Sequence, residues 1–212
     1  MDTELEQFDA VKERKHLKLM KAHQNNIVIS DMNLLDKFKY FEDSKLNESK
    51  SLLYEITEHP RFHKRYARGR IVRVKFGVNV GSEFSGDHFA IVISKGDTMM
   101  SSTLHVIPLT SKKHLKNIDV GNILYNDEEM AKLNELYENT TDRKKRKEIE
   151  SCIKFYKKRK DVISYACVDH LKTISKISIC RTINNYDYLP SLKVSPEILE
   201  ILDKEIIKEY TL

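Results

Sequence analysis

The residue best suited to chemistry is a histidine beside a glycine-containing loop. His88 follows the loop that holds Gly81 and Gly86, and it opens the apolar run at 89–93. A side chain at the start of a strand, next to a loop, can face a substrate instead of the core. Because the pKa of histidine is about 6.5 in peptides, His88 could move protons near neutral pH. The alternative is a structural histidine whose ring is hydrogen-bonded where the strand begins.

Two arginines accompany this histidine in the preceding apolar run. Arg70 and Arg73 alternate with apolar residues around 71–76, so both must project from that predicted strand. Either guanidinium could clamp a phosphate group, which it does better than an ammonium because it donates from a planar fork. A solvent-facing charge on the strand is the alternative for each.

Further polar side chains lie in the loop before His88 and after the apolar run at 104–109. Glu83 is in the loop, where we favour a role in ordering the backbone over a role as a base. Lys112 and Lys113 follow the later run and could neutralise phosphate. Exposed lysines of this kind also form ordinary solvated surface.

Motifs for metal or cofactor binding are absent from the sequence. It has no HExxH, no phosphate-binding P-loop and no cluster of acidic residues typical of a metal site. His59 and His63 are separated by a chain that contains Pro60, and Cys167 with His170 is half of a zinc site at most. The three cysteines form no CxxC pair and indicate reduced, mostly buried thiols. We therefore expect neither a metal nor a cofactor.

The composition is that of a globular protein with a polar bias. The 212 residues include 40% hydrophobic and 33% charged residues, with a formal net charge of +5. No apolar run approaches the roughly 20 residues that a membrane helix needs. The first residues are charged throughout and lack the apolar segment of a signal peptide, so a cytoplasmic location without membrane contact is expected. The modest positive charge permits an anionic partner.

Residues 1–66 form the first of two predicted regions, a helical N-terminal extension. Apolar residues recur there at helical spacing, which favours two or three amphipathic helices, the last ending before Pro60. The residues that carry this pattern are Leu5, Phe8, Val11, Leu17, Leu19, Met20, Leu34, Leu35, Phe38, Phe41, Leu52, Leu53 and Ile56.

Residues 67–212 form the second region, which is rich in short β-type runs. Five of the six glycines of the chain lie between Gly69 and Gly96, and turns between short apolar runs predict an antiparallel sheet or small barrel. Residues 126–161 interrupt this pattern with two helical stripes, which predict an inserted helical hairpin. A last helix is expected from Ser195 onward, with Pro196 at its first position.

Five segments follow one another in a recognisable order: RGRIVRVKF at 68–76, GSE at 81–83 with Gly86, DHFAIVIS at 87–94, VIPLT at 106–110, and SYACV at 164–168 with LKTISKI at 171–177. Together they resemble the MazF/PemK family of toxin endoribonucleases. The resemblance covers about 68–125 and 162–210. It leaves out the N-terminal extension and the helical insertion.

The resemblance implies a mainly β protein with helices, built on an SH3-like small β-barrel of the MazF/PemK (CcdB-like) type. It further implies the toxin of a toxin–antitoxin system, which cleaves single-stranded RNA without a metal. The implied products carry 2′,3′-cyclic phosphate and 5′-hydroxyl ends. An antitoxin protein and a homodimer are the implied partners.

The same resemblance assigns roles to individual residues. Thr110 matches the family's second active-site residue, and His88 takes a place often held by an arginine. That departure favours proton transfer at His88 over phosphate clamping. The predicted catalytic residues are therefore His88 and Thr110. The predicted RNA-binding residues are Arg70, Arg73, Ser82, Glu83, Ser111, Lys112 and Lys113.

Two other functions remain open on the sequence. A barrel that has lost its catalytic arginine could be a non-catalytic module that binds nucleic acid or a protein. A metal-dependent nuclease is the second alternative, and it would lose activity in EDTA.

Overall fold

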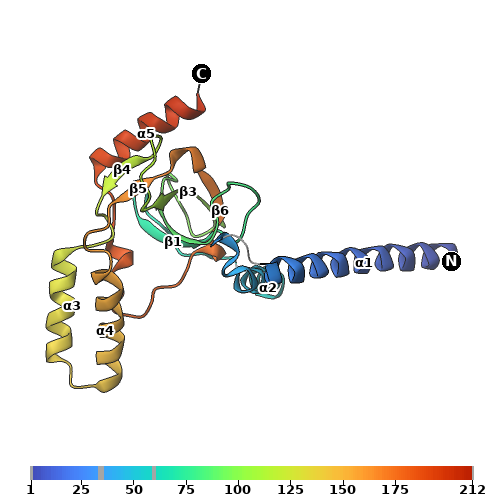
Figure 1. Ribbon diagram of the computed structural model, residues 1–212, viewed down its shortest axis with the longest axis horizontal. Helices are drawn as coiled ribbons and strands as arrows, with labels where there is room; N and C mark the ends of the chain where they lie inside the picture. Colours follow the sequence, from blue (N-terminus) through green and yellow to red (C-terminus); the bar gives the residue numbers. More distant parts are fainter. Residues whose placement is uncertain (1, 33–35, 59–60, 212) are drawn as a thin grey trace.

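Within the residues that the structure describes, the protein combines five α-helices with an antiparallel six-stranded sheet (Figure 1). The computed structural model describes residues 2–32, 36–58 and 61–211, with side chains from residue 11 onward. The strands are β1 (Ile71–Lys75), β2 (Asp87–Val92), β3 (Thr103–Thr110), β4 (Ile118–Gly121), β5 (Ser164–Ala166) and β6 (Lys172–Ser175).

β3 is the centre of the sheet. One of its edges pairs with β2, while the other pairs first with β6 and then with β5. The strand order is β1-β2-β3-β5-β4, with β6 beside β3, so the sheet is not closed. An isolated bridge between Val74 and Ile179 nevertheless brings the chain after β6 beside β1.

Alternate residues of the strands enter two separate cores. In β2, Ile91 packs in one apolar cluster with the helices α4 and α5, whereas Ala90 and Val92 belong to the other. The second cluster also holds Val74 of β1 and Val106 of β3. This two-residue alternation fixes which side chains share a face with His88.

The predicted helical hairpin is present. α3 (Asp127–Asn139) and α4 (Arg143–Lys157) lie antiparallel and project from the sheet (Figure 1). Asn126 caps α3 by accepting from the Glu129 backbone N–H at 2.9 Å. Ile149 and Tyr156 of α4 are fully buried against α3 and the adjoining core.

The predicted C-terminal helix is also present as α5 (Pro196–Tyr210). Ser195 caps it with its hydroxyl, and Pro196 occupies the first turn, where a missing N–H costs nothing. Leu202 buries the inner side of α5 in the first core cluster.

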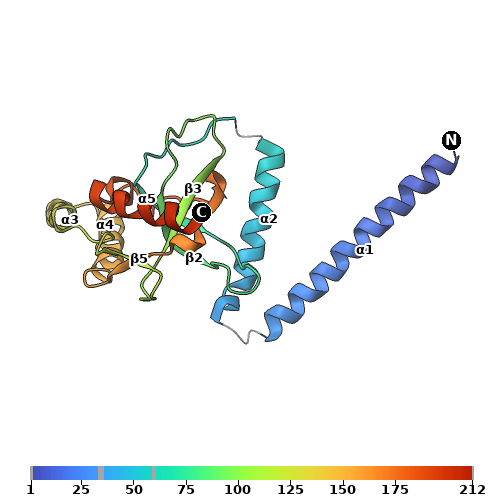
Figure 2. The ribbon, with the colours of Figure 1, turned by 90° about the horizontal axis from the view of Figure 1, so that it is seen from above.

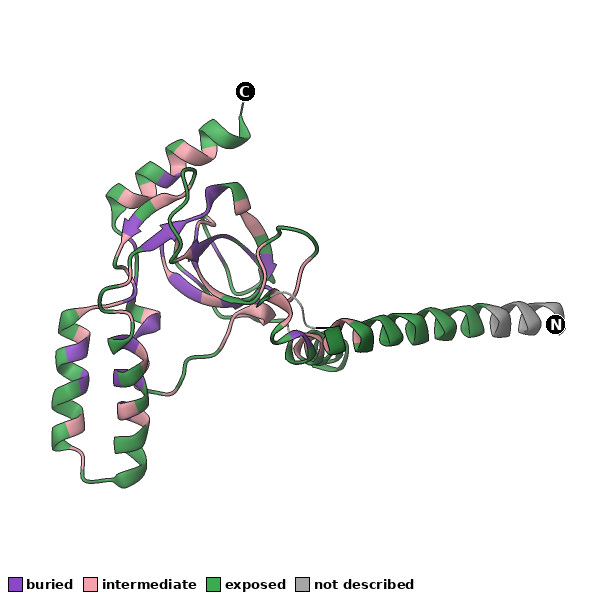
Figure 3. Ribbon diagram, in the orientation of Figure 1, coloured by how far each residue is buried: buried purple, intermediate pink, exposed green. Residues whose placement is uncertain are grey.

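The N-terminal helices make few contacts with the sheet. α1 (Asp2–Met32) extends away from the rest of the molecule (Figure 2). A short 3-10 turn at Asp36–Phe38 follows, and α2 (Phe41–Glu58) then runs beside the sheet. Phe41 is buried, but apolar side chains such as Leu19 of α1 and Ile56 of α2 are exposed (Figure 3). Leu34, Leu35, His59, Pro60 and the side chains of Leu5 and Phe8 lie outside the described residues.

The expectation of a mainly β protein with helices is confirmed in part: the antiparallel sheet is present, but helices make up more of the structure than expected. α1 alone has 31 residues, whereas the longest strand, β3, has 8. The fold is therefore a mixed helical and antiparallel-sheet structure. Within the described residues, every helix is too short or too polar to span a lipid bilayer.

Candidate active site

The loop before His88 is held by its own polar side chains. The Asn79 side-chain amide donates to the carbonyls of Phe76 (3.0 Å) and Phe84 (2.7 Å). The Ser85 hydroxyl accepts from the Asn79 backbone N–H at 3.0 Å. Gly86, at a φ of 91°, adopts a left-handed conformation that suits glycine. These contacts fix the entry into β2, and with it the position of His88.

His88 is half-buried and hydrogen-bonded to this loop. Its Nε2 lies 2.9 Å from the Ser85 carbonyl oxygen. Since a carbonyl only accepts, Nε2 must carry the hydrogen in this bond, which leaves the Nδ1 lone pair as the acceptor. The ring also makes an edge contact with Phe84, with centroids 4.4 Å apart.

The surroundings of His88 favour its neutral form. Burial lowers the pKa of the imidazole, and hydrogen bonding to the backbone of Ser85 and Leu109 and the charge of Asp87 oppose this only in part. A neutral imidazole near pH 7 has the lone pair that a general base requires.

Thr110 lies at the same end of the sheet as His88. The pairing of β2 with β3 ends at Ala90 and Pro108, two residues from His88 on one strand and two from Thr110 on the other. At Thr110 itself, β3 pairs with Tyr165 of β5. Thr110 Oγ1 accepts from the Lys112 backbone N–H at 3.1 Å, so its own hydroxyl hydrogen can be donated elsewhere.

Residues from β6 and the chain before it complete the surroundings of the loop. Lys172 lies opposite Val106 of β3, and its Nζ is 3.4 Å from the Glu83 carboxylate. His170 contacts the Phe84 ring, with centroids 5.6 Å apart. Phe84, His170 and Lys172 were not among the predicted site residues. Their signal in the sequence was weak, because only sheet pairing brings them here.

Ser82 and Glu83 are exposed in the loop before β2. The ion pair of Glu83 with Lys172 joins the loop to β6, which agrees with a role in ordering. Ser111, Lys112 and Lys113 are also exposed, and these three residues directly follow β3.

The structure separates Arg73 and Arg70 from His88. Arg73 lies opposite Phe89, so it projects from the other face of the sheet. Arg70 lies at the far end of β1, near Tyr66, and its Nε is buried without a hydrogen-bond partner. Neither guanidinium shares a surface with His88.

The described residues contain no preassembled metal site. Within 2–32, 36–58 and 61–211, no three His, Cys, Asp or Glu side chains are grouped so that they could hold a metal ion. Cys152 and Cys167 are buried, and burial raises the pKa of the Cys167 thiol to about 11. These thiols therefore stay protonated at neutral pH.

The arrangement at the end of the sheet suits proton transfer beside an anion. A neutral imidazole on β2, a threonine hydroxyl at the end of β3 and the half-buried Lys172 of β6 belong to neighbouring strands. Such groups can accept a proton, donate a hydrogen bond to a charged oxygen and neutralise a phosphate.

Comparisons with known proteins find similarity in structure but not in sequence. No family model and no curated protein matches the sequence. The fold is similar to that of MazF (Form-I) from Deinococcus radiodurans, at 12% identity and a TM-score of 0.38. The match covers 69% of this chain and 96% of that one. Similarity at this level does not establish an activity, so function is inferred from the residues of this chain.

Proposed function

We propose that this chain is an endoribonuclease that cleaves single-stranded RNA without a metal, and that His88 and Thr110 are its catalytic residues. The observation that supports the proposal is that both residues lie two positions past the last pair of β2 and β3, Ala90 and Pro108, at one end of the sheet. The motifs at 86–94 and 106–110 single out these two residues separately.

In the proposed reaction the nucleophile belongs to the RNA. His88 Nδ1 takes the proton of the 2′-hydroxyl, and the 2′-oxygen then attacks phosphorus. The bond from phosphorus to the 5′-oxygen breaks, which gives a 2′,3′-cyclic phosphate and a 5′-hydroxyl after the leaving oxygen is protonated. His170 is our candidate for that acid, because it contacts the same Phe84 ring as His88.

Donors near His88 stabilise the charge that develops on the phosphate oxygens. The Thr110 hydroxyl can donate to one oxygen, and the Lys172 ammonium can neutralise another. Ser82, Glu83, Ser111, Lys112 and Lys113 line the approach for the RNA strand. Arg70 and Arg73 remain predicted RNA contacts outside this end of the sheet.

The proposal includes the finer architecture and partners implied by the family resemblance. Residues 67–212 form an SH3-like barrel domain with the insertion 126–161, and residues 1–66 form a separate extension. The bridge from Val74 to Ile179 supports the barrel, because it brings the chain after β6 beside the free edge of β1. The chain acts as a cytoplasmic toxin, forms a homodimer and is inhibited by an antitoxin protein.

Cleavage of a matched pair of RNA oligonucleotides in EDTA tests this function. One oligonucleotide is all RNA, and the other has a 2′-deoxynucleotide at the mapped cleavage position. We expect EDTA to leave the activity intact, and the deoxy substitution to abolish cleavage at that position alone. Cleavage that EDTA stops would identify a metal-dependent nuclease instead. Cleavage that survives the deoxy substitution would contradict attack by the 2′-oxygen.

A non-catalytic binding module is the second candidate, favoured by one contact. The bond from His88 Nε2 to the Ser85 carbonyl is what a purely structural histidine would make. This candidate predicts that the chain binds single-stranded RNA but cuts no oligonucleotide under any condition in which it stays folded.

A further inference from the structure

The outer face of α4 carries a row of positive charge. Arg143, Lys147, Lys154 and Lys158 are separated by four, seven and four residues, which places them on one side of the helix. The apolar side chains Ile149, Cys152 and Tyr156 occupy the opposite side and are buried. Over the 15 residues of α4 this basic face extends about 22 Å.

These charges are left largely unneutralised by the protein. Among the residues that the structure describes, Lys154 is the one basic side chain of α4 that forms an ion pair, with Glu150. The neighbouring α3 carries acidic residues in its first turn, at Asp127, Glu128 and Glu129, and again at Glu135 and Glu138. α3 is therefore the acidic helix of the hairpin and α4 the basic one.

The position of the charges also disfavours a purely structural role. Arg143 to Lys147 fill the first turns of α4, which contain no acidic residue. The N-terminus of a helix carries partial positive charge, so cations there oppose the helix dipole. A sequence that served only the stability of α4 would place acids at these positions, as α3 does.

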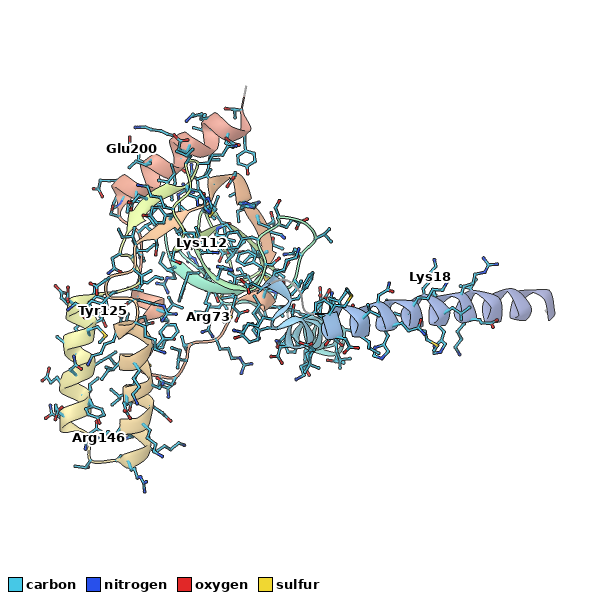
Figure 4. The ribbon with its side chains drawn as sticks, viewed as in Figure 1. Lys18, Arg73, Lys112, Tyr125, Arg146 and Glu200 are labelled. Atoms are coloured by element: carbon cyan, nitrogen blue, oxygen red, sulfur yellow. The ribbon has the colours of Figure 1, made fainter. Side chains whose placement is uncertain are left out.

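The basic face continues onto the sheet through Arg159. Its guanidinium stacks on Phe155, 3.6 Å from the ring centroid, and lies 5.4 Å from the centroid of Phe89. Arg73 is directly opposite Phe89 on β1 and thus projects from the same face. Two guanidinium groups without a described carboxylate partner therefore meet at the base of the hairpin. Arg146, near the tip of the hairpin (Figure 4), instead stacks on Tyr137 of α3, 4.4 Å from the ring centroid.

We infer that the outer face of α4, continued by Arg159 and Arg73, binds the phosphate backbone of single-stranded RNA outside the cleavage site. This inference rests on the proposed function for the identity of the strand as RNA. Binding through phosphates is independent of base sequence, and its strength falls steeply with salt because counterions are released. The hairpin would therefore raise affinity for long strands without affecting the chemical step.

Two variants with equal loss of charge test the inference. The first replaces Arg143, Lys147 and Lys158 of α4 with Gln. The matched control replaces Lys193, Lys204 and Lys208, near and on α5, with Gln. Fluorescence anisotropy measures the binding of a labelled RNA that is 2′-deoxy at the cleavage position, and of a DNA strand of the same sequence, over a range of salt concentrations.

We expect the α4 variant to bind RNA about tenfold to a hundredfold more weakly near 0.1 M salt, with a slope of log affinity against log salt smaller by about 2. The control should differ from the wild type by no more than about twofold. The DNA strand should show the same loss, because its backbone carries the same phosphates. Since the basic residues oppose the helix dipole, the α4 variant should unfold at an unchanged or slightly higher temperature.

Equal losses in both variants would overturn the inference, since they would reflect net charge alone. Unchanged RNA binding by the α4 variant would also overturn it and would point to an acidic protein partner. A loss with RNA but not with DNA would contradict backbone recognition. Because binding is measured without cleavage, a chain that binds in this way but cuts nothing would refute the proposed function and leave this inference standing.

Discussion

The end of the sheet at His88 and the outer face of α4 offer positive charge and hydrogen bonds in different ways. The sheet site is assembled from three strands and a loop, and its residues are distant in sequence. The α4 face arises from one helix by periodicity alone. The first depends on long-range pairing and suits chemistry, which needs defined geometry. The second depends on local structure and suits binding, which needs charge.

The largest expected effect tests the dependence of the sheet site on long-range contacts. Asp97 Oδ1 pairs with Lys176 Nζ at 2.7 Å, and the two side chains are 2% exposed. Asp97→Ala would leave a buried ammonium without its partner, so we expect the free energy of unfolding to fall by about 3 to 5 kcal/mol. Denaturant titration measures this loss.

Glu200→Ala is the matched control, because its pair with Lys204 is largely exposed. We expect it to change stability by less than about 0.5 kcal/mol. Equal effects of the two substitutions would mean that the buried pair does not anchor the sheet.

The second prediction separates chemistry from binding at Thr110. Thr110→Val removes the hydroxyl while keeping the shape, and we expect kcat to fall about 100-fold, or roughly 2.7 kcal/mol, with little change in KM. Thr110→Ser should restore most of the rate. Thr103→Val, at the exposed start of β3, is the control and should leave kcat unchanged. A tenfold rise in KM with normal kcat would assign Thr110 to binding.

The third prediction concerns the dependence of stability on pH. Burial lowers the pKa of His88 below its ordinary 6.5. As the pH falls, the imidazole therefore binds a proton in the unfolded chain before it does so in the folded chain. The contribution of His88 is therefore complete above pH 6.5 and is lost as the pH falls through the lowered pKa. Its slope is at most about 1.4 kcal/mol per pH unit.

Comparison with His88→Asn isolates this contribution. The difference in unfolding free energy between the wild type and this variant should shrink as the pH falls below 6.5. A difference that stays constant with pH would mean that His88 has the same pKa in both states.

The smallest expected effect lies in the hairpin. Asn126→Ala removes the cap of α3, and we expect a loss of about 1 kcal/mol in unfolding free energy. Because the hairpin does not reach His88, kcat for a short RNA should be unchanged. A parallel loss of kcat would show that the two regions are coupled.

The same contrast explains what could be predicted from sequence. The hairpin and α5 follow from helical periodicity and capping residues, which are local signals. Their positions matched the prediction because no distant contact overrides them. The apolar pattern of α1 was weaker, and the helix forms with side chains such as Leu19 exposed.

For the candidate site, only the residues that belong to sequence motifs could be predicted. The two motifs predict His88 and Thr110 as site residues, but how their strands pair is a property of the sheet. The segment LKTISKI at 171–177 illustrates the limit. β6 ends at Ser175, and a 3-10 turn follows at Lys176–Ser178, because Lys176 turns inward to Asp97. That partner is too distant in sequence for a local pattern to reveal.

The rate of RNA cleavage in EDTA by two His88 variants tests the central claim most directly. His88→Gln can still donate to the Ser85 carbonyl from near the Nε2 position but cannot take a proton at neutral pH, whereas His88→Ala loses both functions. We expect both variants to lose kcat by about 100-fold to 10,000-fold while KM stays within a few-fold of the wild type. Wild-type kcat in folded His88→Gln would contradict the account and leave His88 as a structural residue.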